Sequence, residues 1–212
     1  YKAMNKKSNN SIFIFLISIF FFSSCSSDIH YDDILIPAKE TYDGYYGFVN
    51  LDGEMIVNFD LEKSPSIMCE GVSFYQDEKR DDKVSLILKR NKGKVEIKQT
   101  DYIDVLLFNE GLALAVESAG GLVYIDKEAN EVLELDKNIQ KAGYFIEGLA
   151  SFQDNNEKWG FIDKEGKRII TAEYDGVSSF SEGYAVVYKE IKEGKSNIEK
   201  ISVIDNEGKV IT

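Results

Sequence analysis

The chain has 212 residues, of which 37 are acidic and 25 are basic, so its net charge is −12 at pH 7. A surface of that sign repels phosphate backbones and anionic lipid head groups, which excludes nucleic acid as a partner and electrostatic binding to a membrane. The single histidine, His30, excludes histidine triads and metal sites built from two or three histidines.

The amino-terminal segment has the order of a bacterial signal peptide. Lys6-Lys7 precede an apolar run from Ile12 to Phe22, which is too short to span a bilayer, and the run ends at Ser23-Ser24-Cys25. The residues before the cysteine resemble a lipobox, the site where lipoprotein signal peptidase cuts and the cysteine receives lipid, although a phenylalanine stands where leucine is usual. We predict a signal peptide over residues 1–24, with residues 1–3 ahead of the true start, and lipidation of Cys25. The alternative is an ordinary signal peptide that contains a cysteine.

Residues 25–44 are polar and acidic with one proline, and we predict that they form a tether between the lipid anchor and the folded body. The protein would then lie in the bacterial cell envelope, on the outer membrane or the cell surface, and would contact the membrane through lipid. Lipid on Cys25 would also exclude a disulfide with the second cysteine, Cys69, which we interpret as a small core residue.

One stretch defines the unit from which the remaining chain is built. Trp159 to Asp163 is rich in aromatic and β-branched residues and predicts a strand. Asp163 to Gly166 predicts a tight hairpin turn, because Asp bonds its own backbone and Gly adopts positive φ. A returning strand follows, then a second turn at Glu182-Gly183 and a third strand over Tyr184 to Tyr188. Both faces of that strand are apolar, so the sheet needs packing on both sides.

Both halves of this unit recur along the chain at intervals of about 35–40 residues, which is typical of repeat architectures. The strand-and-turn half recurs at Tyr46 to Gly53, Leu86 to Gly93, Leu122 to Asn130, Trp159 to Gly166 and Ile201 to Gly208. In the third of these, Asn130 is expected to take the left-handed conformation in place of glycine. The second half recurs at Glu70-Gly71, Glu110-Gly111, Glu147-Gly148 and Glu182-Gly183.

These residues resemble the WG-repeat family, which is named for the pair that stands here as Trp159-Gly160. The resemblance also includes Phe161, the spaced Asp163 and Gly166, and the Glu-Gly turns, and it covers residues 45–212. It implies a tandem β-repeat, found often in bacterial secreted or surface proteins, with no common activity and no catalytic residues to transfer.

The predicted fold is therefore all-β. Residues 45–212 should form about four and a half antiparallel meanders, stacked as an open solenoid or superhelix. The alternative is a closed ring like a β-propeller, in which the final hairpin pairs with the first unit.

Catalysis is not expected. Carboxylates are numerous, so a glycosidase-like Glu/Asp pair acting on envelope glycans is the third functional hypothesis. However, Glu70, Glu110, Glu147 and Glu182 occupy the same place in every unit, which favours a structural role in the turn. Asp163 to Gly166 also lacks the alternating oxygen ligands of a calcium loop, so we expect neither a metal nor a cofactor.

Aromatic residues offer the remaining candidate site. Exposed tyrosines on repeated hairpins can bind sugars or proteins, although they can equally fill the core between units. The candidate ligand face is Tyr42, Tyr45, Tyr46, Tyr184 and Tyr188. We predict a non-enzymatic binding module for a protein or glycan; the second hypothesis is a structural spacer without a ligand of its own.

Overall fold

The protein is described by a computed structural model, which covers residues 35–39, 44–89, 95–193 and 196–212. The described residues form seventeen β-strands and one short 3-10 turn, η2 (Glu78–Arg80), so the all-β prediction is confirmed. Within these ranges, no helix has the length and apolar character needed to cross a bilayer.

The strands make five antiparallel sheets, each built from consecutive strands, and we number the repeat units by these sheets. The first unit holds β1 (Ile36–Lys39), β2 (Tyr46–Val49) and β3 (Met55–Leu61), and the second holds β4 (Val72–Asp77), β5 (Lys83–Lys89) and β6 (Val95–Gln99). The third unit holds β7 (Tyr102–Val105), β8 (Leu112–Glu117), β9 (Leu122–Asp126) and β10 (Glu131–Glu134). The fourth holds β11 (Ile139–Ile146), β12 (Leu149–Asp154), β13 (Trp159–Ile162) and β14 (Arg168–Tyr174), and the fifth holds β15 (Gly176–Val177), β16 (Tyr184–Glu193) and β17 (Ser196–Asp205).

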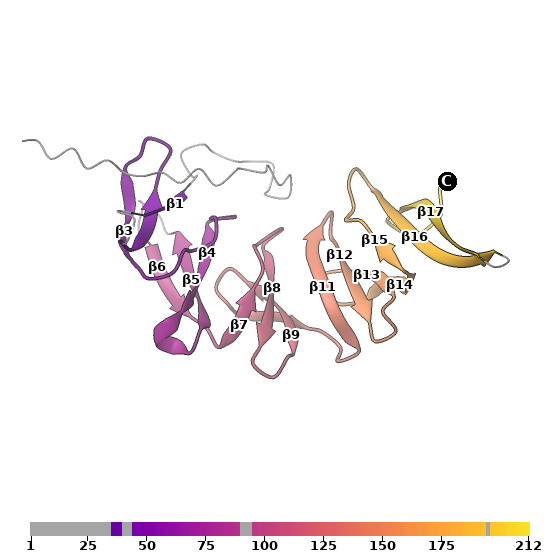
Figure 1. The fold of residues 1–212 in the computed structure, drawn as a ribbon, viewed down its shortest axis with the longest axis horizontal. Coiled ribbons are helices and arrows are strands. Elements are labelled where there is room, and N and C mark those ends of the chain that lie inside the picture. Colours follow the sequence, from indigo (N-terminus) through magenta and orange to yellow (C-terminus); the bar gives the residue numbers. More distant parts are fainter. Residues whose placement is uncertain (1–34, 40–43, 90–94, 194–195) are drawn as a thin grey trace, which may run out of the picture.

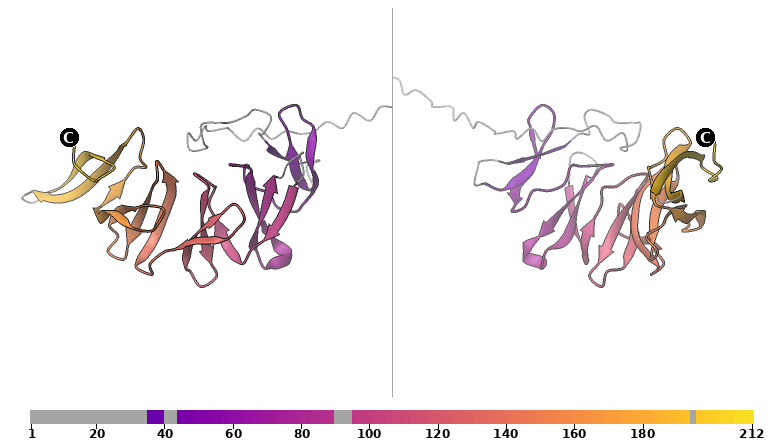
Figure 2. Two further views of the ribbon diagram at one scale, coloured as in Figure 1. Left: turned by 180° about the vertical axis from the view of Figure 1, so that it is seen from behind. Right: turned by 45° about the vertical axis from the view of Figure 1, so that its right-hand side comes forward.

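The units follow one another along an open arc, with the first and fifth sheets at opposite ends (Figures 1 and 2). No strand of the described fifth sheet pairs with the first. The open arrangement predicted from the repeats is the one observed, and the alternative closed ring does not form.

The first sheet begins earlier than the motif suggested, because β1 lies inside the segment expected to be tether. Ala38 pairs with Gly47, and Leu35 and Ala38 are buried. Short apolar residues around Pro37 can form this strand because β1 is an edge strand, where proline is tolerated. The signal peptide (1–24), Cys25, His30 and Tyr42 lie outside the described residues.

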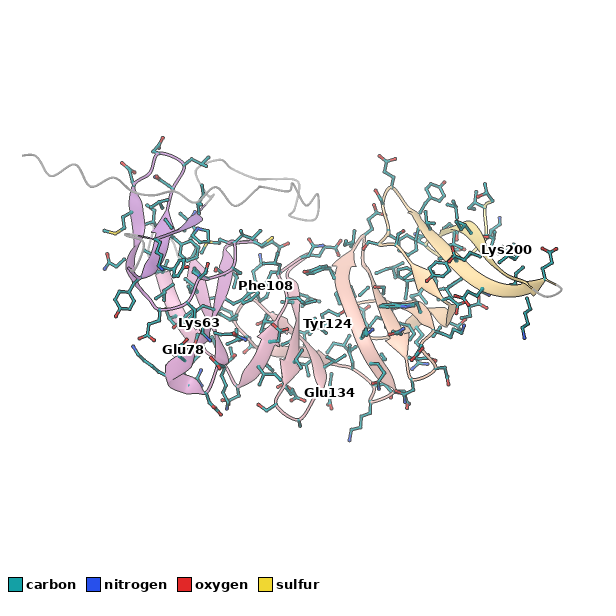
Figure 3. All side chains as sticks on the ribbon, in the orientation of Figure 1. Lys63, Glu78, Phe108, Tyr124, Glu134 and Lys200 are labelled. Atoms are coloured by element: carbon teal, nitrogen blue, oxygen red, sulfur yellow. The ribbon has the colours of Figure 1, made fainter. Side chains whose placement is uncertain are left out.

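The hydrophobic core lies between units. Four clusters of buried side chains each combine residues of two consecutive units. Tyr124 of the third unit contacts Phe145 of the fourth at 4.6 Å between ring centroids, and Phe161 of the fourth contacts Phe180 of the fifth at 4.7 Å. Figure 3 labels Tyr124 between the third and fourth sheets. Each sheet therefore buries both faces only when it has a neighbour on each side.

The glycine of the Trp-Gly pair is required by a close backbone approach. A Cβ on Gly160 would lie 2.4 Å from the Ile170 carbonyl oxygen, because β14 makes a wide bulge opposite this glycine. Gly47 meets the Val57 carbonyl at the same distance in the first unit. In the third unit Val123 replaces the glycine, and it pairs directly with Glu134 instead. Glycine thus stands where the next strand bulges, and valine stands where the next strand pairs regularly.

The hairpin turns follow the Asp-x-x-Gly prediction closely. Asp163 accepts hydrogen bonds from the backbone N–H groups of Glu165 (3.2 Å) and Lys167 (2.8 Å), and Gly166 has φ of +80°. The prediction for the third unit was wrong in one position. Ala129, not Asn130, takes positive φ, because Ala129 stands at the Gly166 position, three residues after Asp126, and its N–H donates to the Asp126 carbonyl oxygen at 2.9 Å.

Candidate binding face

Each Glu-Gly pair forms a tight turn with both residues in the left-handed region. Glu147 and Gly148 have φ of +54° and +81°, and Glu182 and Gly183 have φ of +53° and +82°. Two consecutive positive φ values are the mark of a type I′ turn, in which glycine is preferred at the second position. The glutamate is strained there, by about 1–3 kcal/mol for a residue in a sparsely populated region.

Contacts between units offset this strain at three of the four turns. The Glu147 carboxylate accepts hydrogen bonds from the backbone N–H groups of both Glu182 (2.6 Å) and Gly183 (2.7 Å) in the next unit. The Glu110 carboxylate accepts from Gly148 at 3.1 Å, and that of Glu70 accepts from Gly111 at 2.9 Å. We call Glu70, Glu110 and Glu147 the glutamate ladder. Such charge-assisted bonds are about twice as strong as neutral ones.

Lysines from the next hairpin turn strengthen two steps of this ladder. Lys127 lies 3.0 Å from the Glu70 carboxylate, and Lys164 lies 3.1 Å from that of Glu110. Asn206 holds the equivalent place in the fifth unit, and there Glu147 uses two backbone N–H groups. The predicted structural positions of these glutamates therefore have a specific geometry that joins consecutive units.

The fifth unit ends the ladder. Glu182 is exposed, and among the described residues its carboxylate has neither a hydrogen bond nor an ion pair. Beside it, β16 alternates between buried Ala185 and Val187, which pack on the fourth unit, and exposed residues on the opposite face.

We call this exposed set the terminal face; it consists of Tyr184, Val186, Tyr188 and Ile201. Their exposed fractions are 51%, 48%, 36% and 65%. Tyr188 pairs with Ile201 on β17, and the Tyr188 ring also covers Gly176, where a Cβ would lie 2.1 Å from it. Figure 3 shows this sheet at the end of the arc, where Lys200 marks β17.

Two residues of the terminal face have counterparts in inner units that the next unit covers. Counting from the Glu-Gly turn, Val186 corresponds to Leu114 of β8, which is only 6% exposed and packs against the fourth unit. Tyr184 corresponds to Leu149 of β12, which packs against the fifth. The terminal face is therefore an interface surface that lacks its neighbour within the described chain.

The structure brings together two of the five tyrosines proposed as a ligand face. Tyr184 and Tyr188 lie on the same side of β16. Tyr45 is exposed at the opposite end of the arc, and Tyr46 packs into the core under Lys39, whose ammonium group lies 5.0 Å from the ring centroid. Val186 and Ile201, which complete the face, were not predicted, because their exposure depends on what covers the sheet.

A polar cavity of about 460 Å³ lies beside the second and third units. Lys98, Tyr102, Glu117 and Glu131 contribute to its lining. The Tyr102 hydroxyl donates to Glu131 at 3.2 Å, and burial followed by the Glu131 charge raises the pKa of Tyr102 to about 12. This tyrosine stays protonated at neutral pH. In the part of the chain that the structure describes, no three acidic, histidine or cysteine residues are grouped to hold a metal ion.

One cysteine expectation is wrong in this structure. Cys69 is buried as predicted, next to an isolated bridge with Val72, but it is disulfide-bonded, and the described residues include no free cysteine. A disulfide could not be inferred from the sequence because the lipobox-like pattern assigned Cys25 to lipid.

Comparison with known proteins identifies the repeat. The family model for the WG containing repeat matches residues 159–192, from Trp159-Gly160 through the Glu182-Gly183 turn into β16. No curated protein matches the chain in sequence. Among solved structures, the chain is similar to the computationally designed Ika8 protein, with 11% identity and a TM-score of 0.38 over 87% of this chain and 72% of that chain. The resemblance predicted from the sequence is thus confirmed at its clearest unit: residues 159–192 are a WG containing repeat.

Proposed function

We propose that this protein is a non-enzymatic binding module of the bacterial cell envelope, which holds a protein partner on its terminal face. The observation that carries the proposal is the exposure of Tyr184 and Val186, whose inner counterparts Leu149 and Leu114 are packed against the next unit, with the exposed Tyr188 and Ile201 beside them. Contiguous apolar surface of this kind marks an interaction site, and tyrosine is enriched at such sites.

A protein partner fits this face better than a glycan. Sugar-binding platforms combine aromatic rings with polar groups that fix the hydroxyls, whereas here Val186 lies between the two tyrosines and Ile201 is opposite Tyr188. The spacer hypothesis would leave the face without a role, although its apolar residues cost solubility when exposed.

Two observations weigh against a carboxylate-based glycan hydrolase. The carboxylates of three of the four repeated glutamates already accept hydrogen bonds from the backbone of the next unit. Such a hydrolase needs two facing carboxyl groups, one of which keeps its proton. Glu117 and Glu131 line the polar cavity, but Glu131 accepts from Tyr102.

The partner is tested by photo-crosslinking in envelope preparations. A benzoylphenylalanine at position 186 should give a discrete crosslinked product with a protein. The same probe at Val132, which is 51% exposed on β10, is the matched control. Equal products from both positions, or none from position 186, would contradict the proposed binding face.

Lipid on Cys25, which the sequence predicts, is tested separately with a fatty-acid analogue and cell fractionation. Two or three acyl chains, at about 0.8 kcal/mol for each buried methylene, hold a protein firmly to a membrane. Label and membrane attachment should be lost in Cys25→Ala. Because the chain has two cysteines, a thioether on Cys25 and a disulfide within the chain exclude each other. An unlabelled native protein whose cysteines react with thiol reagents only after reduction would overturn the lipid anchor while leaving the binding face untouched.

A further inference from the structure

We infer that the terminal face receives a further repeat unit of this same fold, and that Glu182 holds it by accepting hydrogen bonds from the backbone of its Glu-Gly turn. The inference rests on the proposed function, since it names the class of partner for that face. The boundaries between inner units show the two kinds of contact that such a partner would make, hydrogen bonds to a turn and apolar packing between sheets.

The polar half is the glutamate ladder. At three successive boundaries, a glutamate carboxylate reaches the backbone N–H groups of the next Glu-Gly turn. Glu182 has the same turn conformation as Glu147, with φ values of +53° and +54°, yet its carboxylate has no such acceptor role among the described residues. The group that satisfies it should therefore be a turn with two left-handed residues and exposed N–H groups. A lysine placed as Lys127 and Lys164 are would add an ion pair.

The apolar half is the complementary surface of a neighbouring unit. On the fourth unit, the fifth places Ala185, Val187 and Ile204, which are small or branched and almost fully buried. Antiparallel strands with residues of that shape fit closely over a sheet face, and the area they cover supplies most of the free energy. Tyr184, Val186 and Tyr188 of the terminal face hold the strand positions that, in the fourth unit, face the fifth. The partner sheet should therefore present small apolar residues that alternate along a strand, as Ala185 and Val187 do.

A second copy of this chain lacks a matching open end. The far side of its first sheet holds Ala38, Gly47 and Val49, and all three are buried. Two copies would also carry a net charge of −12 each, which opposes association. The unit on the terminal face is therefore not the first sheet of a second copy.

The probe is an added unit in the same chain. Asp205 to Thr212 repeats the pattern of Asp163 to Ile170, and the pairing of Ile204 with Val210 matches that of Ile162 with Arg168. A second copy of residues 171–205, fused directly after Thr212, therefore continues the repeat in register. In this extended chain, we expect the added residues to resist limited proteolysis and the thermal unfolding midpoint to rise.

Substitutions show whether the added unit sits on the terminal face. Glu182→Ala and Val186→Glu should each lower the unfolding midpoint of the extended chain, by about 2–4 °C for Glu182→Ala, and leave the midpoint of the chain without the added unit unchanged. Glu147→Ala is the matched control and should lower the midpoint of both chains. An added unit that is digested while residues 35–212 persist, or substitutions without effect in the extended chain, would overturn the inference. A concentration-dependent dimer of the chain without the added unit, abolished by Val186→Glu, would also overturn it, since the occupant would then be a second copy.

The two proposals fail in different ways. If the photo-crosslink at position 186 forms while the added unit fails to dock, the binding face stands and the partner class is wrong. If the added unit docks while position 186 captures no protein, the face accepts a repeat unit but the proposed function fails.

Discussion

The boundary between the fourth and fifth units and the free side of the fifth unit are built from corresponding positions, but only the first is covered. At the boundary, both oxygens of the Glu147 carboxylate are bonded to the next turn, and Leu149 packs into the shared core. On the free side, Glu182 is exposed and Tyr184 is half exposed. Position in the repeat determines what a residue can contact, and the presence of a neighbour determines whether it does.

This comparison changes how the acidic residues are interpreted. A repeated glutamate in a strained turn resembles a functional residue when it is considered alone. The ladder shows that the strain at Glu147 coincides with two short hydrogen bonds to the next unit, which is a structural reason for its conformation. Glu182 keeps the same strained conformation without those hydrogen bonds. Its carboxylate can therefore still accept bonds from the backbone N–H groups of a partner.

The largest contrast is expected between Leu114 and Val186, which hold equivalent positions. Leu114→Ala should destabilise the protein by about 2–5 kcal/mol, because a buried side chain is removed and the cavity relaxes only partly. Val186→Ala should change stability by less than about 0.5 kcal/mol, as at most exposed sites. Urea unfolding, compared at a constant m-value, measures both. Equal losses for the two variants would show that the terminal face is covered within the chain.

A second, smaller contrast concerns the glycine of the motif. Gly160→Ser places a Cβ against the Ile170 carbonyl at 2.4 Å, so the bulge in β14 must shift, at about 1–3 kcal/mol. Ser202 holds the equivalent position in β17 and pairs regularly with Val187, so the reverse change, Ser202→Gly, should cost only about 0.5–1 kcal/mol.

Thermal unfolding measures this contrast, and the emission of Trp159, the single tryptophan, reports locally on the bulge. A shift in emission is expected for Gly160→Ser alone. If Gly160→Ser is as mild as Ser202→Gly, the close approach is not what requires the glycine.

The turns could be predicted from the sequence because their chemistry is local. Asp163 bonds N–H groups two and four residues away, and Gly183 has positive φ within its own turn. Residue types at short spacing contain that information. The prediction of a left-handed Asn130 was wrong, because the turn places its left-handed residue three positions after the Asp, at Ala129.

The candidate site could not be predicted to the same extent, because it depends on contacts between distant segments. The N–H groups that Glu147 binds lie 35 and 36 residues further along the chain. Tyr45 and Tyr46 are adjacent in sequence, yet one is exposed and the other packs into the core. Alternation along a strand predicts two faces, but only the order of stacked units tells which face is left open.

The smallest expected effect is a pH dependence at the boundary between the fourth and fifth units. The Asp175 carboxylate bonds the Lys158 side chain of the fourth unit and accepts from the Glu190 N–H of β16 at 2.8 Å. The Lys158 hydrogen bond, and after it the Glu190 N–H, lowers the pKa of the Asp175 carboxyl below its usual 3.8. A carboxyl whose pKa is lower in the folded state stabilises that state above the pKa of the unfolded chain, and this contribution is lost as the pH falls through the folded value.

The native protein should therefore be more stable than Asp175→Asn at pH 7, and the difference should shrink below about pH 4. Added salt should also reduce it, because the pair is partly exposed and is screened. Unfolding midpoints at pH 7 and pH 3, with Lys158→Ala as the partner variant, measure this effect; a difference that stays constant between the two pH values would mean that the ion pair does not help to hold the two units together.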